Sequence, residues 1–300
     1  MTDSNPCAVR DARMELLGVS VEGAVRARYY ENDPFFREAA TIAAASATGN
    51  FETLGSMLRK FTLIVFKPDA AAGDAVAPGL AFLRAHGLMP VTGRLIRFTP
   101  AMIRSLWRYQ FNRTSPERLL VTDALLCSGP SLAVLLRSAR NDDLAAQRLA
   151  ALKGSADSSG PTDGSLRGLL GRRNAILNMV HTPDDPASFL RDALICLGSR
   201  DYRRWLDLMA QPSMATDALP SLPRPAGGLD FETAVAELRA FAIEGPQRRA
   251  YEALTRGELP YEALAGLLRA TRDDMAARWH ATIAASYLVP LNRPGVDKLI

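Results

Sequence analysis

The chain has 300 residues, about twice the common domain size of roughly 100–150 residues, so two domains or one extended domain are expected. Hydrophobic residues make up 48% and charged residues 23% of the chain, which excludes a collagen-like, low-complexity or wholly disordered protein. The formal net charge of +4 is too small for a chain of this length to argue for DNA or RNA, so no nucleic acid is predicted as a partner.

Cysteine usage and apolar run lengths indicate the compartment. The three cysteines, Cys7, Cys127 and Cys196, form no CxxC pair, which argues against a disulfide scaffold and favours a reducing compartment. The first residues, MTDSNPCAVRDARMELLG, place acidic residues before any apolar run and do not resemble a secretory signal. No apolar stretch approaches the roughly 18 residues needed to span a bilayer. We therefore expect a cytoplasmic protein without membrane association.

The first elements expected along the chain are helical. Residues 1–59 are predicted to form an N-terminal extension that is weakly patterned up to residue 20 and helical beyond it, with a break at Gly49-Asn50. The next run, Phe61–Phe66, is β-branched and aromatic and is apolar on both faces. Such a run predicts a central strand buried on both sides.

Helices and strands then alternate in the predicted order. Strands are expected at 88–98, Ser131–Leu136 and Ala175–Val180, and helices at 76–86, 100–110, 116–126, 142–153 and Pro186–Leu197. This order, within about 140 residues, is that of the split βαβ, ferredoxin-like fold of the α+β class. We therefore assign residues 60–200 to a four-stranded antiparallel sheet covered by helices.

The last third of the chain is expected to be a linker followed by helices. Residues 201–230 are predicted to be a linker, because the stretch 211–229 holds four prolines and two glycines without periodicity. Residues 231–300 are predicted to form a helical C-terminal region, in which apolar side chains recur at helical spacing, as is typical of a core face.

Residues able to carry chemistry lie near the ends of the predicted strands. Lys67-Pro68-Asp69 closes the first strand and Asn178-Met-Val-His181 closes the fourth, and ligands commonly bind at strand ends in open sheets. Arg148 lies on the helix after the third strand, and Arg167-Gly168 follows a long polar loop at 154–164. Each of these features alone has an ordinary structural explanation. Their order and setting carry the signal.

The series FTLIVFKPD, SGP, an arginine-bearing helix, a Ser/Gly/Pro loop, RG and NMVH resembles the nucleoside diphosphate kinase family over roughly half of the chain. The combination of FTLIVFKPD with the RG and NMVH segments is its most specific part. The resemblance implies a kinase-type phosphotransferase. Such an enzyme moves the γ-phosphoryl group of ATP or another NTP through a phosphohistidine to a nucleoside diphosphate or another phosphate acceptor. Mg²⁺ is implied as a companion of the nucleotide phosphates.

The resemblance also implies roles on the phosphate side of the site. His181 matches the histidine that is phosphorylated, and neutral imidazole is a suitable nucleophile near pH 7. Lys67, Arg148 and Arg167 match cations that hold the phosphates and neutralise charge on the transferring group. Asn178 matches an asparagine that holds the sugar hydroxyl near the phosphates.

Further roles are implied around the histidine. Ser155 falls where the family has a phosphate-contacting threonine. Tyr109 is the nearest candidate for the tyrosine that orients the histidine, although ungapped counting places Trp107 there. Asp192 aligns with a glutamate that hydrogen-bonds the histidine ring and is one methylene shorter.

Two segments depart from the family pattern. Thr182-Pro183-Asp184-Asp185 stands where the family has Gly-Ser-Asp-Ser, so a serine that assists the histidine is lost and two acidic residues lie near the phosphates. The aromatic run that clamps the base is replaced by Arg113–Arg118, which holds no aromatic residue. The phosphate apparatus is therefore retained better than the base pocket.

Three interpretations fit this imbalance. The first is an active phosphotransferase that uses His181. The second is a nucleotide- or phosphate-binding module that no longer turns over and serves as a sensor or scaffold. The third is an interaction protein with a vestigial site. The helical extensions are in each case the predicted route to a homo-oligomer or a protein partner. Retention of Lys67, two arginines, Asn178 and His181 together favours the first.

Overall fold

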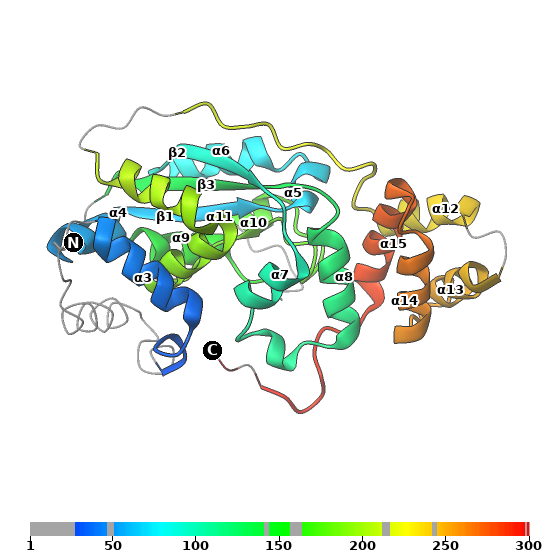
Figure 1. The fold of residues 1–300 in the computed structure, drawn as a ribbon. Helices are drawn as coiled ribbons and strands as arrows, with labels where there is room; N and C mark the ends of the chain where they lie inside the picture. The colour runs from blue at the N-terminus through cyan, green and yellow to red at the C-terminus, as the bar shows by residue number, and fades with distance from the viewer. Residues whose placement is uncertain are drawn as a thin grey trace.

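Four strands form one antiparallel sheet in the computed structural model (Figure 1). They are β1 (Phe61–Phe66), β2 (Leu88–Ile96), β3 (Ser131–Ser138) and β4 (Val180–His181), in the spatial order β2-β3-β1-β4. Each neighbouring pair runs antiparallel. This order, with helices connecting the strands, confirms the ferredoxin-like α+β fold that the sequence predicts. The structure describes residues 28–46, 51–140, 144–156, 164–211, 217–241, 245–297 and 299. Residues 1–27 of the predicted N-terminal extension, which include Cys7, lie outside this part of the chain.

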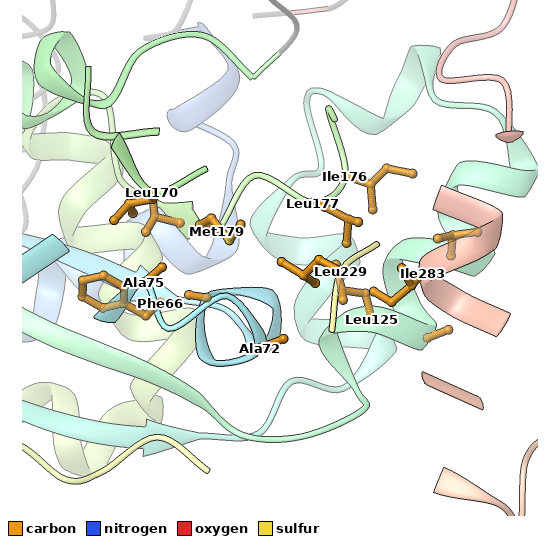
Figure 2. Packing of buried hydrophobic residues seen from close by; sticks show 14 of the residues in the cluster. Phe66, Ala72, Ala75, Leu125, Leu170, Ile176, Leu177, Met179, Leu229 and Ile283 are labelled. Atoms are coloured by element: carbon orange, nitrogen blue, oxygen red, sulfur yellow. The ribbon is translucent and has the colours of Figure 1, made fainter. Parts of the chain in front are cut away.

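The central strand β1 is buried along its whole length, as its composition predicts. Because successive side chains of a strand point to opposite faces, Ile64 and Phe66 enter one hydrophobic core, whereas Leu63 and Val65 enter the other. Figure 2 shows Phe66 beside Ala75 and Leu170, on the first of these faces. Both faces of the sheet are therefore covered by helices.

The helices of the sheet domain are largely those expected. They are α5 (Pro68–Ala72), α6 (Val76–Ala85), α7 (Pro100–Leu106), α8 (Pro116–Leu126), α9 (Ala145–Lys153), α10 (Leu166–Leu169) and α11 (Pro186–Met209), with a 3-10 turn, η1, at Phe111–Arg113. Thr99, Ser115 and Asp185 cap α7, α8 and α11 with their side chains, and each is followed by proline. This pairing of an oxygen-bearing cap with proline at the first helical position fixes where the helices start. The helix predicted at Pro186–Leu197 is longer, because α11 continues to Met209 through a kink at Gly198.

The fourth strand is much shorter than the predicted Ala175–Val180, so that prediction is wrong in its extent. The side-chain oxygen of Asn174 accepts hydrogen bonds from the backbone N–H groups of Ile176 and Leu177, both at 2.9 Å. Such a side chain folds the backbone into a turn and competes with strand pairing. Met179 also has a φ of 68°, which a strand does not use.

Helices outside the sheet domain cover it from two sides (Figure 1). The N-terminal helices α3 (Pro34–Ser46) and α4 (Phe51–Lys60) pack with α11 in the core that includes Leu63. The C-terminal helices are α12 (Phe231–Phe241), α13 (Gly245–Thr255), α14 (Tyr261–Ala270) and α15 (Met275–Leu288), of which α14 and α15 contact α8. In the described part of the chain, no helix combines the length and the apolar character needed to cross a membrane.

Residues 217–230 contain no helix or strand and join the sheet to the C-terminal helices as an extended segment (Figure 1). At one end, the Thr92 hydroxyl donates to the Asp217 carboxylate at 3.0 Å. At the other end, the indole N–H of Trp279 donates to the carbonyl of Gly228 at 3.0 Å. Leu229 is buried in the same hydrophobic cluster as Leu125 and Ile283 (Figure 2). This part of the predicted linker is therefore packed against its neighbours.

Candidate functional site

A cavity of about 210 Å³ lies at the edge of the sheet where β1 ends and β4 begins. Four of the residues singled out from the sequence line it: Lys67, Arg167, Asn178 and His181. A second cavity, of about 170 Å³, lies beside the first and shares Trp107, Gln110, Arg167 and His181 with it. The imidazole of His181 therefore stands at the boundary between two cavities.

The imidazole of His181 is held from two directions. Its Nε2 lies 2.8 Å from Oδ2 of Asp192 on α11. The Trp107 ring packs against it in an edge-to-face arrangement, with ring centroids 5.1 Å apart and an interplanar angle of 74°. Because a carboxylate only accepts hydrogen bonds, the neutral imidazole carries its proton on Nε2 and its lone pair on Nδ1. Nδ1 is thus the nitrogen available for nucleophilic chemistry.

The ammonium group of Lys67 is placed by the end of β1 and is almost fully buried. Its Nζ donates to the carbonyl of Ile176 at 3.0 Å and lies 3.4 Å from Oδ2 of Asp69. Burial lowers the pKa of Lys67 below its ordinary value; the Asp69 carboxylate opposes this shift and the Arg167 cation adds to it. An anion that entered the cavity would compensate part of the solvation that this ammonium has lost.

Asp69 also fixes the backbone next to the histidine. Met179 is a non-glycine residue with a φ of 68°, and its N–H donates to Oδ2 of Asp69 at 2.8 Å. The carbonyl of Met179 accepts from the backbone N–H of Lys67 at 2.9 Å. A backbone in this left-handed region persists only where its surroundings hold it, and such positions cluster at functional sites. The Lys-Pro-Asp motif thus shapes the chain between Asn178 and His181.

Arg167 and Asn178 are positioned by backbone carbonyls. The guanidinium of Arg167 donates to the carbonyls of Gly154 and Val180, both at 3.0 Å. The side chain is buried between the segment that contains Gly154 and β4. The side-chain amide of Asn178 donates to the carbonyl of Ala175 at 2.7 Å. Both side chains are therefore fixed at the cavity wall, with a cation and an amide facing the same space as Nζ of Lys67.

Arg148 and Ser155, two further residues expected at the site, are not brought to the first cavity. Arg148 donates to the hydroxyl of Ser138 at 3.0 Å. Ser138 lies at the opposite end of β3 from Leu132, the partner of Phe66, so Arg148 lies at the far end of the sheet from Lys67. Ser155 is exposed, and its carbonyl accepts from Arg172.

Tyr109 also does not contact the histidine. Its hydroxyl donates to the carboxylate of Asp33 at 2.7 Å, and the ring lines the second cavity. Trp107, the residue that ungapped counting places there, lies against His181 instead. The sequence offered both residues as candidates, and the structure places the tryptophan at the histidine.

The two acidic residues after His181 are compensated by neighbours. Asp185 caps α11 and accepts from the backbone N–H of Ser188 at 2.7 Å. Asp184 pairs with Lys153 at 3.0 Å. Burial lowers the pKa of Lys153, while the Asp184 carboxylate opposes the shift. The two negative charges that the sequence places near the phosphates are therefore offset by a helix N-terminus and an ammonium group.

The structure adds residues that the sequence analysis did not single out. Phe111, two residues before the Arg113–Arg118 run, lines the first cavity together with Trp107, and the two rings stack with centroids 6.0 Å apart. Arg113 and Arg118 line the same cavity. The backbone of this segment is paired with the C-terminal tail, since the N–H of Arg293 donates to the carbonyl of Arg113 at 2.6 Å. The two arginines could have been expected from the Arg113–Arg118 run, which stands where the family has its base-clamping segment. Phe111 lies outside that run, and nothing in the sequence around it indicates a binding role.

No group of three or more His, Cys, Asp or Glu side chains placed to hold a metal ion occurs among the described residues.

Comparisons with known proteins give similarity in structure only. No protein-family model matches the chain, and no curated protein matches its sequence. The solved structures similar to it include a nucleoside diphosphate kinase from Aquifex aeolicus, with 24% identity, a TM-score of 0.39, and coverage of 45% of this chain and 93% of that one. An NDP kinase from Pyrobaculum aerophilum has 16% identity, a TM-score of 0.39, and coverage of 48% and 97%. A halophilic nucleoside diphosphate kinase from Halobacterium salinarum, in complex with CDP, has 20% identity, a TM-score of 0.39, and coverage of 49% and 97%.

Proposed function

We propose that this chain is a phosphotransferase of the nucleoside diphosphate kinase type, with His181 as the phosphorylated residue. The observation that carries the proposal is the setting of this imidazole. Its Nε2 is held by Asp192 at 2.8 Å, and the ring borders a cavity lined by Lys67, Arg167 and Asn178. A nucleophilic nitrogen, two buried cations and an amide in one cavity are the parts that phosphoryl transfer needs from a protein.

The proposed reaction has two balanced steps. In the first, the Nδ1 lone pair of His181 attacks the γ-phosphorus of the Mg²⁺-bound NTP; an N–P bond forms, the bond to the bridging oxygen breaks, and NDP leaves. In the second, a terminal phosphate oxygen of the acceptor attacks the same phosphorus, and the N–P bond breaks. Asp192 keeps the proton on Nε2 throughout and stabilises positive charge on the ring.

The cations of the cavity support the charge of the transferring group. Lys67 and Arg167 are held by carbonyls of the cavity wall, so little reorganisation is needed when phosphates bind. Arg113 and Arg118 supply two more guanidinium groups in the same cavity. Arg148 has no part in this arrangement. The cation that the family places on that helix is replaced, in this proposal, by arginines from the 113–118 run.

Labelling with γ-³²P ATP tests the proposal. The wild type should acquire an acid-labile, base-stable phosphoryl group, His181→Ala should acquire none, and His86→Ala should be labelled like the wild type. His86 is the matched control because its ring bonds the carbonyl of Phe82 at the end of α6. A wild type that takes no label from ATP or GTP contradicts the proposal. Labelled protein that transfers to no nucleoside diphosphate points to another phosphate acceptor.

A nucleotide- or phosphate-binding module is the second candidate. It is favoured by the segment after His181, where Pro183 offers no donor and the hydroxyl of Thr182 is buried without a hydrogen-bond partner among the described residues. Such a module binds ADP in calorimetry and yields no phosphoprotein. A cytoplasmic location, and a homo-oligomer or a protein partner docked on the helical extensions, belong to both candidates as predictions.

A further inference from the structure

A buried network of charged side chains links His181 to the N-terminal helices. Oδ1 of Asp192 accepts from Nη1 of Arg191 at 3.1 Å, and Nε of Arg191 donates to Oδ2 of Asp33 at 2.9 Å. Asp33 immediately precedes α3, and the hydroxyl of Tyr109 donates to the same oxygen at 2.7 Å. Asp33 is 0% and Arg191 1% exposed, so solvent does not screen the interaction between the charges of this network.

The charged groups of this network stabilise one another. Burial acts to raise the pKa of Asp33, but the charge of Arg191 and the hydrogen bond from Tyr109 lower it below its ordinary value. Burial acts to lower the pKa of Arg191, and the carboxylates of Asp192 and Asp33 raise it above its ordinary value. The guanidinium is also enclosed by aromatic rings, with Tyr109 centred 5.4 Å and Tyr30 5.7 Å from its central carbon. Both groups therefore stay charged at neutral pH.

The same guanidinium holds the other neighbour of the histidine. Nη1 of Arg191 donates to the carbonyl of Leu106 at 3.1 Å, and Nη2 donates to the carbonyl of Ser105. These carbonyls belong to the end of α7, immediately before Trp107, whose ring meets His181. Arg191 thus fixes both Asp192 and the turn that carries Trp107, while Asp33 fixes the orientation of Arg191.

We propose that Asp33 and Arg191 are positioning residues for His181, and that the segment containing Asp33 is therefore part of the catalytic unit. This inference rests on the proposed function for its kinetic consequence. Neither residue lines the first cavity, so neither meets a nucleotide bound there. Their effect is to hold the carboxylate and the indole that fix the plane of the imidazole. A small displacement of a reacting group is enough to slow transfer severely.

Asp33→Asn tests the proposal, because it removes the charge and keeps the shape. The limiting rate of His181 phosphorylation by MgATP should fall by at least about tenfold, whereas the ATP concentration for half-saturation should stay within about twofold. Asp201→Asn is the matched control: Asp201 also lies on α11 and pairs with an arginine, Arg94, at 2.9 Å, but it does not line either cavity. It should be phosphorylated at the wild-type rate.

A second readout does not depend on activity. The chain holds only three histidines, so ¹⁵N-histidine NMR resolves His181 once His181→Ala assigns its signals. The wild type should show the tautomer with the proton on Nε2, and Asp33→Asn should lower its share. If the wild type is never phosphorylated, the proposed function fails, and the tautomer comparison still decides the positioning role.

The double variant Asp33→Asn/Arg191→Met covers the case in which the single variant unfolds. Removing both members of the Asp33–Arg191 pair leaves neither of these two uncompensated, and Asp192 keeps its contact with His181 at 2.8 Å; such replacements are often tolerated. We expect the double variant to fold and to remain at least about tenfold slow, because Arg191 then no longer holds Asp192 and the turn before Trp107. Wild-type phosphorylation rates in both variants, with an unchanged His181 tautomer, would overturn the proposal.

Discussion

Replacing Lys67 separates the structural and the ligand-binding contributions of the buried ammonium. In Lys67→Met, the carboxylate of Asp69, which is 0% exposed, loses the cation 3.4 Å away. Removing one partner of a buried ion pair typically costs about 3–5 kcal/mol. We expect a decrease of this size in the free energy of unfolding, measured by urea denaturation.

A second substitution should recover most of that stability. In Lys67→Met/Asp69→Asn no buried charge is left over, and an amide oxygen still accepts the N–H of Met179, which the wild-type carboxylate accepts at 2.8 Å. Nucleotide binding should not recover with it. A hydrogen bond to a charged group contributes about 1.5–3 kcal/mol, so the affinity for ADP should fall roughly 10- to 150-fold in the double variant.

Isothermal titration calorimetry with ADP measures this loss on the folded double variant. Lys60→Met is the matched control, because Lys60 directly precedes the opposite end of the same strand, β1. It should bind ADP like the wild type. An unchanged affinity in the double variant would refute the placement of Lys67 against phosphate, and an unchanged stability in Lys67→Met would refute the dependence of Asp69 on this cation.

Three further outcomes are expected. Gly227→Ala should lower the free energy of unfolding by about 1–3 kcal/mol, because its Cβ would lie 2.6 Å from Cε1 of the His280 ring, whereas Gly228→Ala meets nothing within 4 Å and should change little; thermal denaturation distinguishes them. The pKa of Asp33 is lower in the folded state than the ordinary value of about 3.9, so its stabilisation is fully present above about pH 4 and is lost as the pH falls through the folded-state value. The difference in unfolding free energy between wild type and Asp33→Asn should thus be constant from about pH 5 to 8 and shrink at lower pH, and a constant difference below about pH 4 would contradict this. Asp185→Ala should cost about 1 kcal/mol by urea denaturation, since it removes the cap of α11, and no loss would refute the capping role.

The elements set by local signals could be predicted from the sequence. Phe61–Phe66 is too apolar for a surface strand, and the caps Thr99, Ser115 and Asp185 with their following prolines mark helix starts. The fourth strand could not be delimited in this way. The positive φ of Met179 depends on Asp69, which lies 110 residues earlier, and no local pattern reports such a contact.

The candidate site shows the same division. Lys67 directly follows β1, Asn178 precedes β4 and His181 ends it, and the three line one cavity. Arg148 does not: it donates to the hydroxyl of Ser138 at 3.0 Å, at the other end of β3. Each residue along a helix turns the side-chain direction by about 100°, so the order of residues in the sequence does not fix where a helical side chain points. Asp33 could not be identified from the sequence, because its partner Arg191 lies 158 residues away. An aspartate directly before a helix is also typical of a helix N-cap, and Asp33 does accept the backbone N–H of Phe36.

The position of the phosphoryl group on the protein tests the central claim most directly. The wild type is mixed with MgATP, freed of nucleotide at alkaline pH, and examined by ³¹P NMR and by mass spectrometry of its peptides. Because Nε2 of His181 is engaged by Asp192 at 2.8 Å, we predict one phosphoramidate, on Nδ1 of His181. A phosphoryl group on Nε2 or on another residue, or none at all, would contradict the account.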